Sequence, residues 1–426
     1  MATANVGLWK NKNIMYLFAS QIFSALGDGI CLLAILTLFG LEKDASPMEM
    51  AYVTLSLGLP FVLFGPMTGV LADKFERKKL MIISDLCRCV IMLAVVVSVN
   101  QIWILYVLFF LKGTFESLFT PAKNGKLKEY VRTEQMEQAV SITTVIDYGS
   151  KIVGPAAGGI LVAYLGVNTA FYTNAVTFLL SALCLLGLGK RSVSGEEGSN
   201  TDERKESFMA LFRGGLRFIR NNPTLLYGLL AFSIAMFVLT LTDSQLVVLI
   251  RELPKVPSSL FGMVMGAVGL GTLVAAALLS QIKLRNAVPY MAIGCLGVGL
   301  SFFLITLFTQ RALGGVWSWY LPLGLLGGSF AALVFVPYQT MAQKMTPESL
   351  TSRVFGVIGS FSTLATIIGP LLGGVFIQAY GIFTVFYIAS ALLAVTSVVL
   401  IGVSRLAPKG ERDLTMSQAQ EVGDKL

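Results

Sequence analysis

The residues best suited to chemistry in this sequence are ionisable side chains that lie inside long apolar runs. An ionisable group near the centre of a bilayer costs at least about 2.5 kcal/mol, so it is kept there by pairing or by function. Asp28 lies midway along the first run and Asp243 near the outer end of the seventh, and neither has a basic residue three or four positions away. Two further carboxylates each lie four residues from a lysine, on one helical face: Glu116 with Lys112, and Asp147 with Lys151.

The chemistry that these groups predict is the binding and release of protons. The chain contains no histidine, so a group that takes up a proton near neutral pH must be a carboxylate in surroundings that disfavour its charge. We expect Asp28 to be that group, because Lys112 and Lys151 can keep Glu116 and Asp147 ionised. The alternative is structural: each lysine pair neutralises itself, or Asp28 meets Lys112 across a helix interface.

The motifs of several other functions are absent from the sequence. No Gly-x-x-x-x-Gly-Lys-[Ser/Thr] stretch is present to bind nucleotide phosphates. The five cysteines all fall in apolar runs without Cys-x-x-Cys spacing, which favours buried hydrophobic side chains over metal or redox sites. The sequence therefore predicts no ATP hydrolysis, no metal site, no cofactor and no enzyme activity.

The elements that position these charges are long apolar helices. The chain has 426 residues, of which 55% are hydrophobic and 13% charged, and its mean hydropathy is +0.75, which is typical of a polytopic membrane protein. A helix of ~20 apolar residues spans the hydrocarbon core. We expect twelve spans, at about 14–39, 49–72, 79–99, 101–121, 139–164, 168–189, 223–250, 258–282, 288–309, 317–343, 352–380 and 382–404.

The distribution of lysine and arginine predicts the orientation. The net charge is +8, and these residues are enriched in short cytoplasmic loops. Twelve crossings from an inside amino terminus leave four cations in outer loops: Lys43, Arg251, Lys255 and Arg311. We therefore expect both termini in the cytoplasm, and the charge indicates contact with membrane lipids and not with nucleic acid.

The two halves of the chain repeat one helix-packing motif. Glycines let helices approach backbone to backbone, and proline bends its helix. The motif occurs twice, a constant 215 positions apart, as Gly154-Pro155-x-x-Gly158-Gly159 and as Gly369-Pro370-x-x-Gly373-Gly374. This repeat predicts two six-helix bundles with a binding site between them.

The boundaries of the domains follow from changes in composition. We expect an N-terminal bundle at residues 1–190, a cytoplasmic linker at 191–222, a C-terminal bundle at 223–405 and a polar cytoplasmic tail at 406–426. In the second part of the linker, apolar residues recur at helical spacing and three arginines fall on another face. This pattern predicts an amphipathic helix on the anionic inner leaflet, with a solvated connector helix as the alternative.

The stretch from Gly69 to Lys79 is a short burst of charge between two apolar runs. Its sequence, Gly-Val-Leu-Ala-Asp-Lys-Phe-Glu-Arg-Lys-Lys, resembles the signature loop of the major facilitator superfamily, which lies between the second and third helices on the cytoplasmic face. The resemblance implies an all-α integral membrane fold, with twelve transmembrane helices in two pseudo-symmetric six-helix bundles. Glu76 stands where that family has a second glycine, so we expect a different local shape for the turn.

Other stretches resemble the macrolide-efflux branch of that superfamily, the third drug–proton antiporter family. They are Ser84-Asp85-Leu86-x-Arg88, Gly27-Asp28 and Lys112-Gly113. We also expect charge pairs beside the signature loop to hold the inner ends of the helices together. The residues of this expected cytoplasmic gate are Gly69, Asp73, Arg77, Asp85 and Arg88.

The resemblance implies a secondary transporter in a bacterial cytoplasmic membrane. We expect a monomer that exchanges protons for a small amphipathic or drug-like compound, such as a macrolide, by alternating access. In that superfamily the first, fourth, fifth and seventh helices border the central cavity. The resemblance therefore implies that six intramembrane charges share one polar chamber: Asp28, Lys112, Glu116, Asp147, Lys151 and Asp243. Two alternatives stay open: the same fold carrying a lysophospholipid or siderophore, and a transport-dead receptor or scaffold.

Overall fold

The structure is a computed structural model of the chain. It describes residue 8 and residues 11–131, 135–189, 208–254, 260–282 and 286–406. These segments are almost entirely helical, and they contain no β-strand. The all-α fold expected from the sequence is confirmed.

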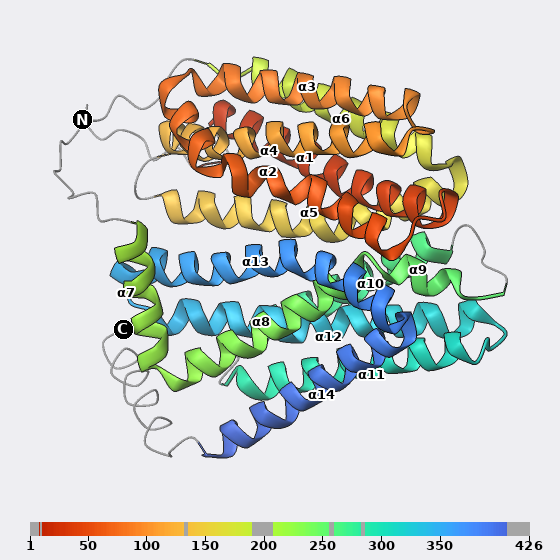
Figure 1. Ribbon diagram of the computed structural model, residues 1–426. Coiled ribbons are helices and arrows are strands. Elements are labelled where there is room, and N and C mark those ends of the chain that lie inside the picture. Colours follow the sequence, from red (N-terminus) through yellow and green to blue (C-terminus); the bar gives the residue numbers. More distant parts are fainter. Residues whose placement is uncertain are drawn as a thin grey trace.

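The first half of the chain forms a bundle of six long helices, which is the upper half of Figure 1. The first of these helices continues into a short π-helix, η2. The elements are α1 (Lys12–Thr37), η2 (Leu38–Glu42), α2 (Pro47–Lys74), α3 (Arg77–Val97), α4 (Ile102–Tyr130), α5 (Met136–Leu165) and α6 (Val167–Leu186).

The second half forms the lower bundle of Figure 1, with six long helices and two shorter ones. The shorter helices lie at opposite ends of this bundle: α7 at one end and α9, which has only 6 residues, at the other. The elements are α7 (Phe208–Asn221), α8 (Pro223–Asp243), α9 (Leu246–Arg251), α10 (Leu260–Ser280), α11 (Val288–Gln310), α12 (Val316–Met345), α13 (Glu348–Tyr380) and α14 (Ile382–Leu406).

Twelve of these helices are long enough to cross a membrane. Within the described segments, eleven satisfy both the length and the hydropathy expected of a span. The twelfth is α5, whose 30 residues extend about 45 Å at 1.5 Å per residue. Within its described residues, Val153–Leu165 forms an apolar stretch. The predicted twelve-helix architecture is therefore confirmed.

Two helix boundaries differ from the sequence prediction. α4 continues past Pro121 to Tyr130, and Lys126 and Glu129, which the sequence predicts in a loop, pair within the helix at 2.6 Å. The run predicted at 223–250 is broken at Ser244 and Gln245 into α8 and α9. The break turns α9 toward η2 of the other bundle, with which it is in contact.

The glycine-proline motif of α5 ties this helix to both bundles. Gly154 faces Gly29 of α1, and a Cβ atom on Gly154 would lie 2.7 Å from the Cα atom of Gly29. Gly159 faces the backbone of Gly262 in α10, so closely that no side chain fits at either position. Such backbone-to-backbone contacts need glycine on both helices.

The repeat of this motif in α13 makes the equivalent contacts, one to a helix of the second bundle and one to a helix of the first. Gly373 faces the backbone of Leu241 in α8, in its own bundle. Gly374 faces α2 in the other bundle, where a Cβ atom on it would lie 2.8 Å from the carbonyl oxygen of Pro47. The two halves are thus joined by a pseudo-symmetric pair of helix crossings.

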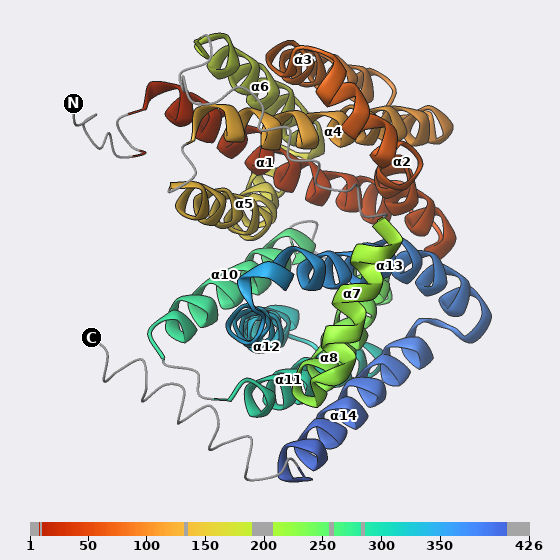
Figure 2. The same ribbon diagram turned by 90° about the vertical axis from the view of Figure 1, so that its left-hand side faces the viewer.

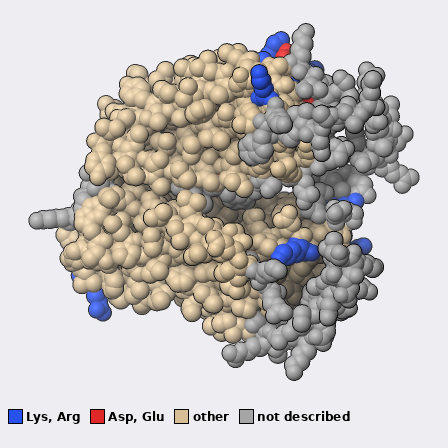
Figure 3. Space-filling view, turned by 180° about the vertical axis from the view of Figure 1, so that it is seen from behind, with Lys and Arg blue, Asp and Glu red and all other residues tan. Residues whose placement is uncertain are grey.

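The bundles meet at one end and separate at the other. We call the end with the Phe75–Glu76 loop and α7 the loop end, and the end with η2 and α9 the far end. The crossings of α2 with α13 and of α5 with α10 are tight toward the far end. Farther along α2 the gap is wider: a Cβ atom added to Gly58 would lie 3.8 Å from the side chain of Ile367. Closer to the loop end, four glycines of α2 and α13 have no described atom of another segment within 4 Å of such a Cβ position: Gly65, Gly69, Gly356 and Gly359. Figure 3 shows the resulting hollow between the halves.

Helix α7 lies across the loop end of the lower bundle. Seen from that end, it crosses in front of α13 and α8 (Figure 2). Ile219 is buried against the bundle, and Gly215 packs against the backbone of Arg353 in α13. Arg213 and Arg217 are exposed on the other side of the helix, so the amphipathic pattern predicted from the sequence corresponds to one packed and one open face.

The arrangement predicts that the two ends label from opposite sides of the membrane. We expect a cysteine replacing Gln101, between α3 and α4, to react with an impermeant thiol reagent from outside the cell. A cysteine replacing Lys344, at the end of α12, should react only after permeabilisation, since both lie at exposed positions at opposite ends. The measurement uses a background without the five native cysteines. Labelling of both from one side would contradict the twelve-span topology.

Candidate functional site

The centre of the candidate site is an ion bridge between three helices of the first bundle. The Asp28 carboxylate of α1 lies 2.6 Å from the Lys112 ammonium of α4 and 3.5 Å from the Arg88 guanidinium of α3. The side chain of Asp28 is 22% exposed, whereas its two partners are almost completely buried. A single carboxylate thus joins α1, α3 and α4 in the interior of the bundle.

Arg88 is held in place by a second carboxylate and by aromatic rings. Its guanidinium bonds to Asp85 and lies 4.8 Å from the centre of the Phe119 ring and 4.4 Å from that of Phe178. Ser181 of α6 donates a hydrogen bond of 2.5 Å to Asp85. Such charge-assisted bonds and cation–π contacts are strongest where water is excluded. The side chains of Asp85 and Arg88 are 0% and 1% exposed.

The sequence predicts that Asp85 and Arg88 join the gate at the signature loop. In this structure both lie inside the bundle, where Arg88 bonds to Asp28 and Asp85 accepts a hydrogen bond from Ser181. The reason is helical geometry: both follow the loop by about two or three turns of α3, which carries them toward the middle of the membrane.

Glu116 completes the group, and we call these five residues the Asp28 cluster: Asp28, Asp85, Arg88, Lys112 and Glu116. The Lys112 ammonium lies 3.1 Å from the Glu116 carboxylate, one turn along α4. Lys112 therefore contacts both Glu116 and Asp28, as the structural alternative of the sequence analysis anticipated. The cluster holds three carboxylates and two cations, so with every group ionised it carries one net negative charge.

Asp147 lies outside this cluster, closer to the loop end. Gln21 of α1 donates a hydrogen bond of 2.8 Å to its carboxylate, and the Lys123 ammonium of α4 lies at 3.5 Å. Neither partner follows from the sequence pattern, because the hydropathy predicts Lys123 in a loop after the fourth helix and Gln21 is neutral and far away in sequence. The side chain of Lys151, the partner expected there, lies outside the described residues.

Asp243 is the acidic group of the second bundle, and it is also separate from the Asp28 cluster. It is the last residue of α8 and is exposed. Within the part of the chain that the structure describes, no ion pair reaches it. Among the described side chains of the six charges, Asp28, Lys112 and Glu116 are joined by ion pairs, whereas Asp147 pairs with Lys123 and no described ion pair involves Asp243. No three potential metal ligands converge among the described residues.

The signature loop has its own set of contacts. The Arg77 guanidinium lies 3.0 Å from Glu129 and donates to the carbonyl oxygens of Ala72 and Gly125, at 3.3 Å each. It therefore links α3 to α4 and to the end of α2. Gly69 belongs to α2 and faces the open hollow, and the side chain of Asp73 lies outside the described residues.

Glu76 shows why the loop tolerates the loss of a glycine. Its φ of −64° and ψ of 109° are ordinary extended values, so no left-handed residue is needed there. Its carboxylate lies 2.9 Å from the Lys79 ammonium. This hydrogen bond and the nearby positive charges lower the pKa of the Glu76 carboxyl.

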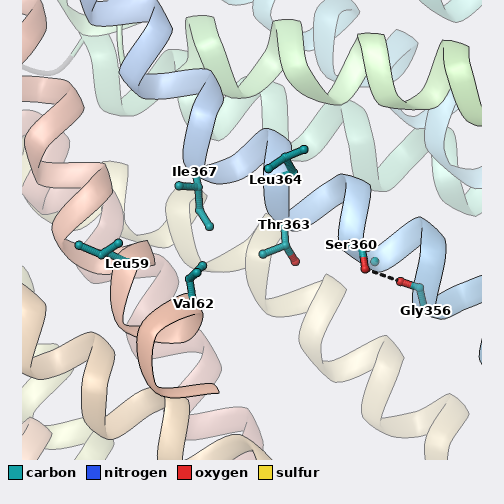
Figure 4. A pocket seen from close by; sticks show the side chains of 8 residues that line it. Leu59, Val62, Gly356, Ser360, Thr363, Leu364 and Ile367 are labelled. Carbon is teal, nitrogen blue, oxygen red and sulfur yellow. Dashed lines mark hydrogen bonds between the residues drawn. The ribbon is translucent and has the colours of Figure 1, made fainter. Parts of the chain in front are cut away.

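A cavity of about 540 Å³ lies between α2 and α13, on the hollow side of their crossing. Leu59 and Val62 of α2 face Thr363 and Ile367 of α13 across it (Figure 4). Its lining is mostly aliphatic, with the hydroxyls of Ser360 and Thr363 as the polar side-chain groups. A cavity of this size and character suits a compound with a large apolar surface.

Comparison with known proteins identifies the family. A major facilitator model described as "transmembrane secretion effector" matches residues 7–424. The chain belongs to the major facilitator superfamily. The match confirms the superfamily expected from the sequence, and similarity to macrolide efflux protein A and to multidrug efflux pumps supports the expected macrolide-efflux branch.

Individual relatives align with this chain over nearly its whole length. The uncharacterized MFS-type transporter YfiS of Bacillus subtilis (strain 168) is 37% identical and covers 93% of this chain and 94% of its own. Macrolide efflux protein A of Streptococcus pyogenes is 24% identical, with 92% and 95% covered. Further relatives, 25–26% identical, include multidrug efflux pumps and a lysophospholipid transporter.

The solved structures show the same fold. A bacterial homolog of the human lysosomal transporter Spinster, described as inward-facing and unoccupied, superposes with a TM-score of 0.65 at 15% identity and covers 92% of this chain and 95% of its own. A likeness at that identity establishes the major facilitator fold of this chain and nothing about its cargo.

The buried ion pairs predict that replacing a buried acid destabilises the protein far more than replacing an exposed one. Asp85→Asn leaves Arg88 buried without its nearest carboxylate, and breaking such a pair costs about 3–5 kcal/mol. We expect a clearly lower midpoint of thermal unfolding in detergent. The control, Glu76→Gln, removes an exposed pair, which contributes little. Equal midpoints for the two variants would show that the Arg88 contacts do not stabilise the bundle.

Proposed function

We propose that the protein is a secondary active transporter that exports an amphipathic, drug-like compound in exchange for protons. The observation that carries the proposal is the Asp28 cluster, in which one partly accessible carboxylate joins three helices that are otherwise held by buried charges. Membership of the major facilitator superfamily and similarity to efflux proteins support the transport of a small compound.

The charge of the cluster supports proton uptake at this place. Because the cluster carries one net negative charge, binding of a single proton makes it neutral, and charge in a medium of low dielectric constant is costly. Asp28 and Glu116 are the accessible carboxylates, at 22% and 31% exposed, whereas Asp85 is 0% exposed. We propose Asp28 as the site, because its contacts join three helices whereas the ion pair of Glu116 with Lys112 lies within α4. A proton on Asp28 weakens its bonds to Lys112 and Arg88 and so loosens α1 from α3 and α4.

The separation of the bundles supports alternating access. We propose that the loop end faces the cytoplasm of a bacterial cell, as the distribution of cations predicts. The structure then corresponds to an inward-open state, in which the hollow receives cargo from the cytoplasm or the inner leaflet. Arg77 and Asp73 are proposed to close this end in the other state, and one chain is proposed to suffice for the cycle.

The lining of the cavity supports an apolar or amphipathic cargo but selects none. Leu59, Val62 and Ile367 offer dispersion contacts, and the nearby hydroxyls offer few directional bonds. The second candidate cargo is a lysophospholipid, which the similarity to a lysophospholipid transporter favours. A siderophore is a further alternative. A transport-dead receptor would have no need for a partly accessible carboxylate among these buried charges.

Reconstitution distinguishes these cargoes. Purified protein in liposomes with an imposed pH gradient should accumulate a macrolide or a cationic dye in exchange for protons. Movement of a lysophospholipid alone would favour the second candidate. Absence of any gradient-driven flux across macrolides, dyes, siderophores and lysolipids would contradict the proposal and favour the receptor.

The coupling role of Asp28 predicts a specific loss in Asp28→Asn. We expect proton-driven uphill transport to fall by about two orders of magnitude, because the amide cannot release a proton, while downhill flux persists because the bundles still move. The measurements are gradient-driven accumulation and counterflow in the same proteoliposomes. Glu252→Gln, an exposed acid at the far end, is the matched control and should keep both activities.

The contrary result is equally clear. Full gradient-driven accumulation by Asp28→Asn would show that another carboxylate carries the proton. Glu116→Gln, Asp147→Asn and Asp243→Asn would then be compared in the same assay. Loss of both fluxes in Asp28→Asn with a normal unfolding midpoint would assign Asp28 to cargo binding and not to coupling.

A further inference from the structure

Three side chains at the start and end of α9 connect the second bundle to the first at the far end. Residues 246–250 of α9 are all buried. Val247 packs directly on Gly40 of η2, where even a Cβ atom would overlap it. Gln245, which precedes α9 and is fully buried, donates a hydrogen bond of 3.0 Å to the carbonyl oxygen of Pro47.

Arg251 ends α9 and makes the principal polar contact between the bundles at this end. Its Nη1 atom donates to the carbonyl oxygen of Gly40 at 3.2 Å and to that of Ala45 at 3.0 Å. The Asp44 carboxylate lies 3.7 Å away but is 79% exposed, so this ion pair contributes little. The contact therefore depends on the two carbonyl oxygens.

One acceptor of these bonds, Gly40, lies in the irregular end of α1, and the other, Ala45, lies in the loop before α2. Gly40 lies in η2, and the last carbonyl groups of a helix lack donors within the helix. A guanidinium offers several donors in a fixed plane and satisfies two such groups at once. When the far end opens, the carbonyl groups of Gly40 and Ala45 must exchange this donor for water.

We infer that Arg251 is a positioning residue for the transport cycle: its bonds to Gly40 and Ala45 hold the far end closed, and their rupture permits the far end to open. Gln245 supports the same closure through Pro47. The inference rests on alternating access in the proposed function, but it names a contact between the bundles that is separate from the Asp28 cluster and from the cavity.

The test measures conformation directly. Spin labels on cysteines at Gln101 and Tyr380 report the width of the far end, and labels at Lys128 and Lys344 report the loop end, since all four positions are exposed. Distances are measured by double electron–electron resonance on the full chain in lipid nanodiscs, without cargo or a pH gradient. Failure of transport in a separate assay therefore leaves this test valid.

We expect Arg251→Met to raise the ratio of far-end-open to far-end-closed molecules roughly tenfold or more, the effect of losing a charge-assisted hydrogen bond. The loop-end distances should shorten in the same molecules. Arg251→Lys keeps the charge without the planar fork and should shift the ratio less. Arg311→Met, which removes an exposed far-end cation, is the matched control and should leave both distances unchanged.

Unchanged distances in Arg251→Met would overturn the inference. An equal shift in Arg311→Met would also overturn it, because the effect would then follow from far-end charge in general. If Arg251→Met fails to fold, Arg251→Lys and Gln245→Leu provide the test. The same direction of shift in both supports the inference, and parental distances in both refute it.

Discussion

The structure depends on one electrostatic constraint: charges placed inside a membrane bundle must neutralise one another across helices. Lys112 and Arg88 are almost fully buried, and a buried cation without a partner is strongly destabilising. Asp28 supplies part of the compensation for both, so the first, third and fourth helices share one carboxylate. The same arrangement that stabilises the bundle makes its packing sensitive to the protonation of a single group.

A second constraint is the close approach of helix backbones. Where Gly154 meets Gly29 and Gly159 meets Gly262, no side chain separates the helices, so their distance is fixed while their angle is less restricted. The equivalent glycines of α13 contact α8 and α2. Beyond these crossings the bundles separate toward the loop end, as the open surroundings of Gly65 and Gly69 show.

The sequence predicted the features that follow from local pattern, and it missed those that follow from contacts between helices. Hydropathy, the repeated glycine-proline motif and the signature loop sufficed for twelve helices in two bundles. The spacing of Lys112 and Glu116 predicted their pair correctly, because both lie on one helix. The bonds of Asp28 to Arg88, of Asp147 to Gln21 and of Arg251 to Gly40 join residues far apart in sequence. No periodicity within one helix can reveal such partners, and a break such as that before α9 depends on what α9 packs against.

Helix α1 connects the elements of the proposed cycle. Asp28 joins it to α3 and α4, the next residue, Gly29, packs against α5, and its η2 extension bonds to Arg251. Asp28 and Gly40 are twelve residues apart, or about 18 Å along a helix at 1.5 Å per residue. In the proposed cycle, a proton on Asp28 would loosen α1 from α3 and α4, and a tilt of α1 would displace its η2 end relative to Arg251. One continuous helix thus offers a physical link between the proposed protonation site and the proposed far-end closure. The proposal assigns no role in coupling to Asp243, which makes no ion pair among the described residues.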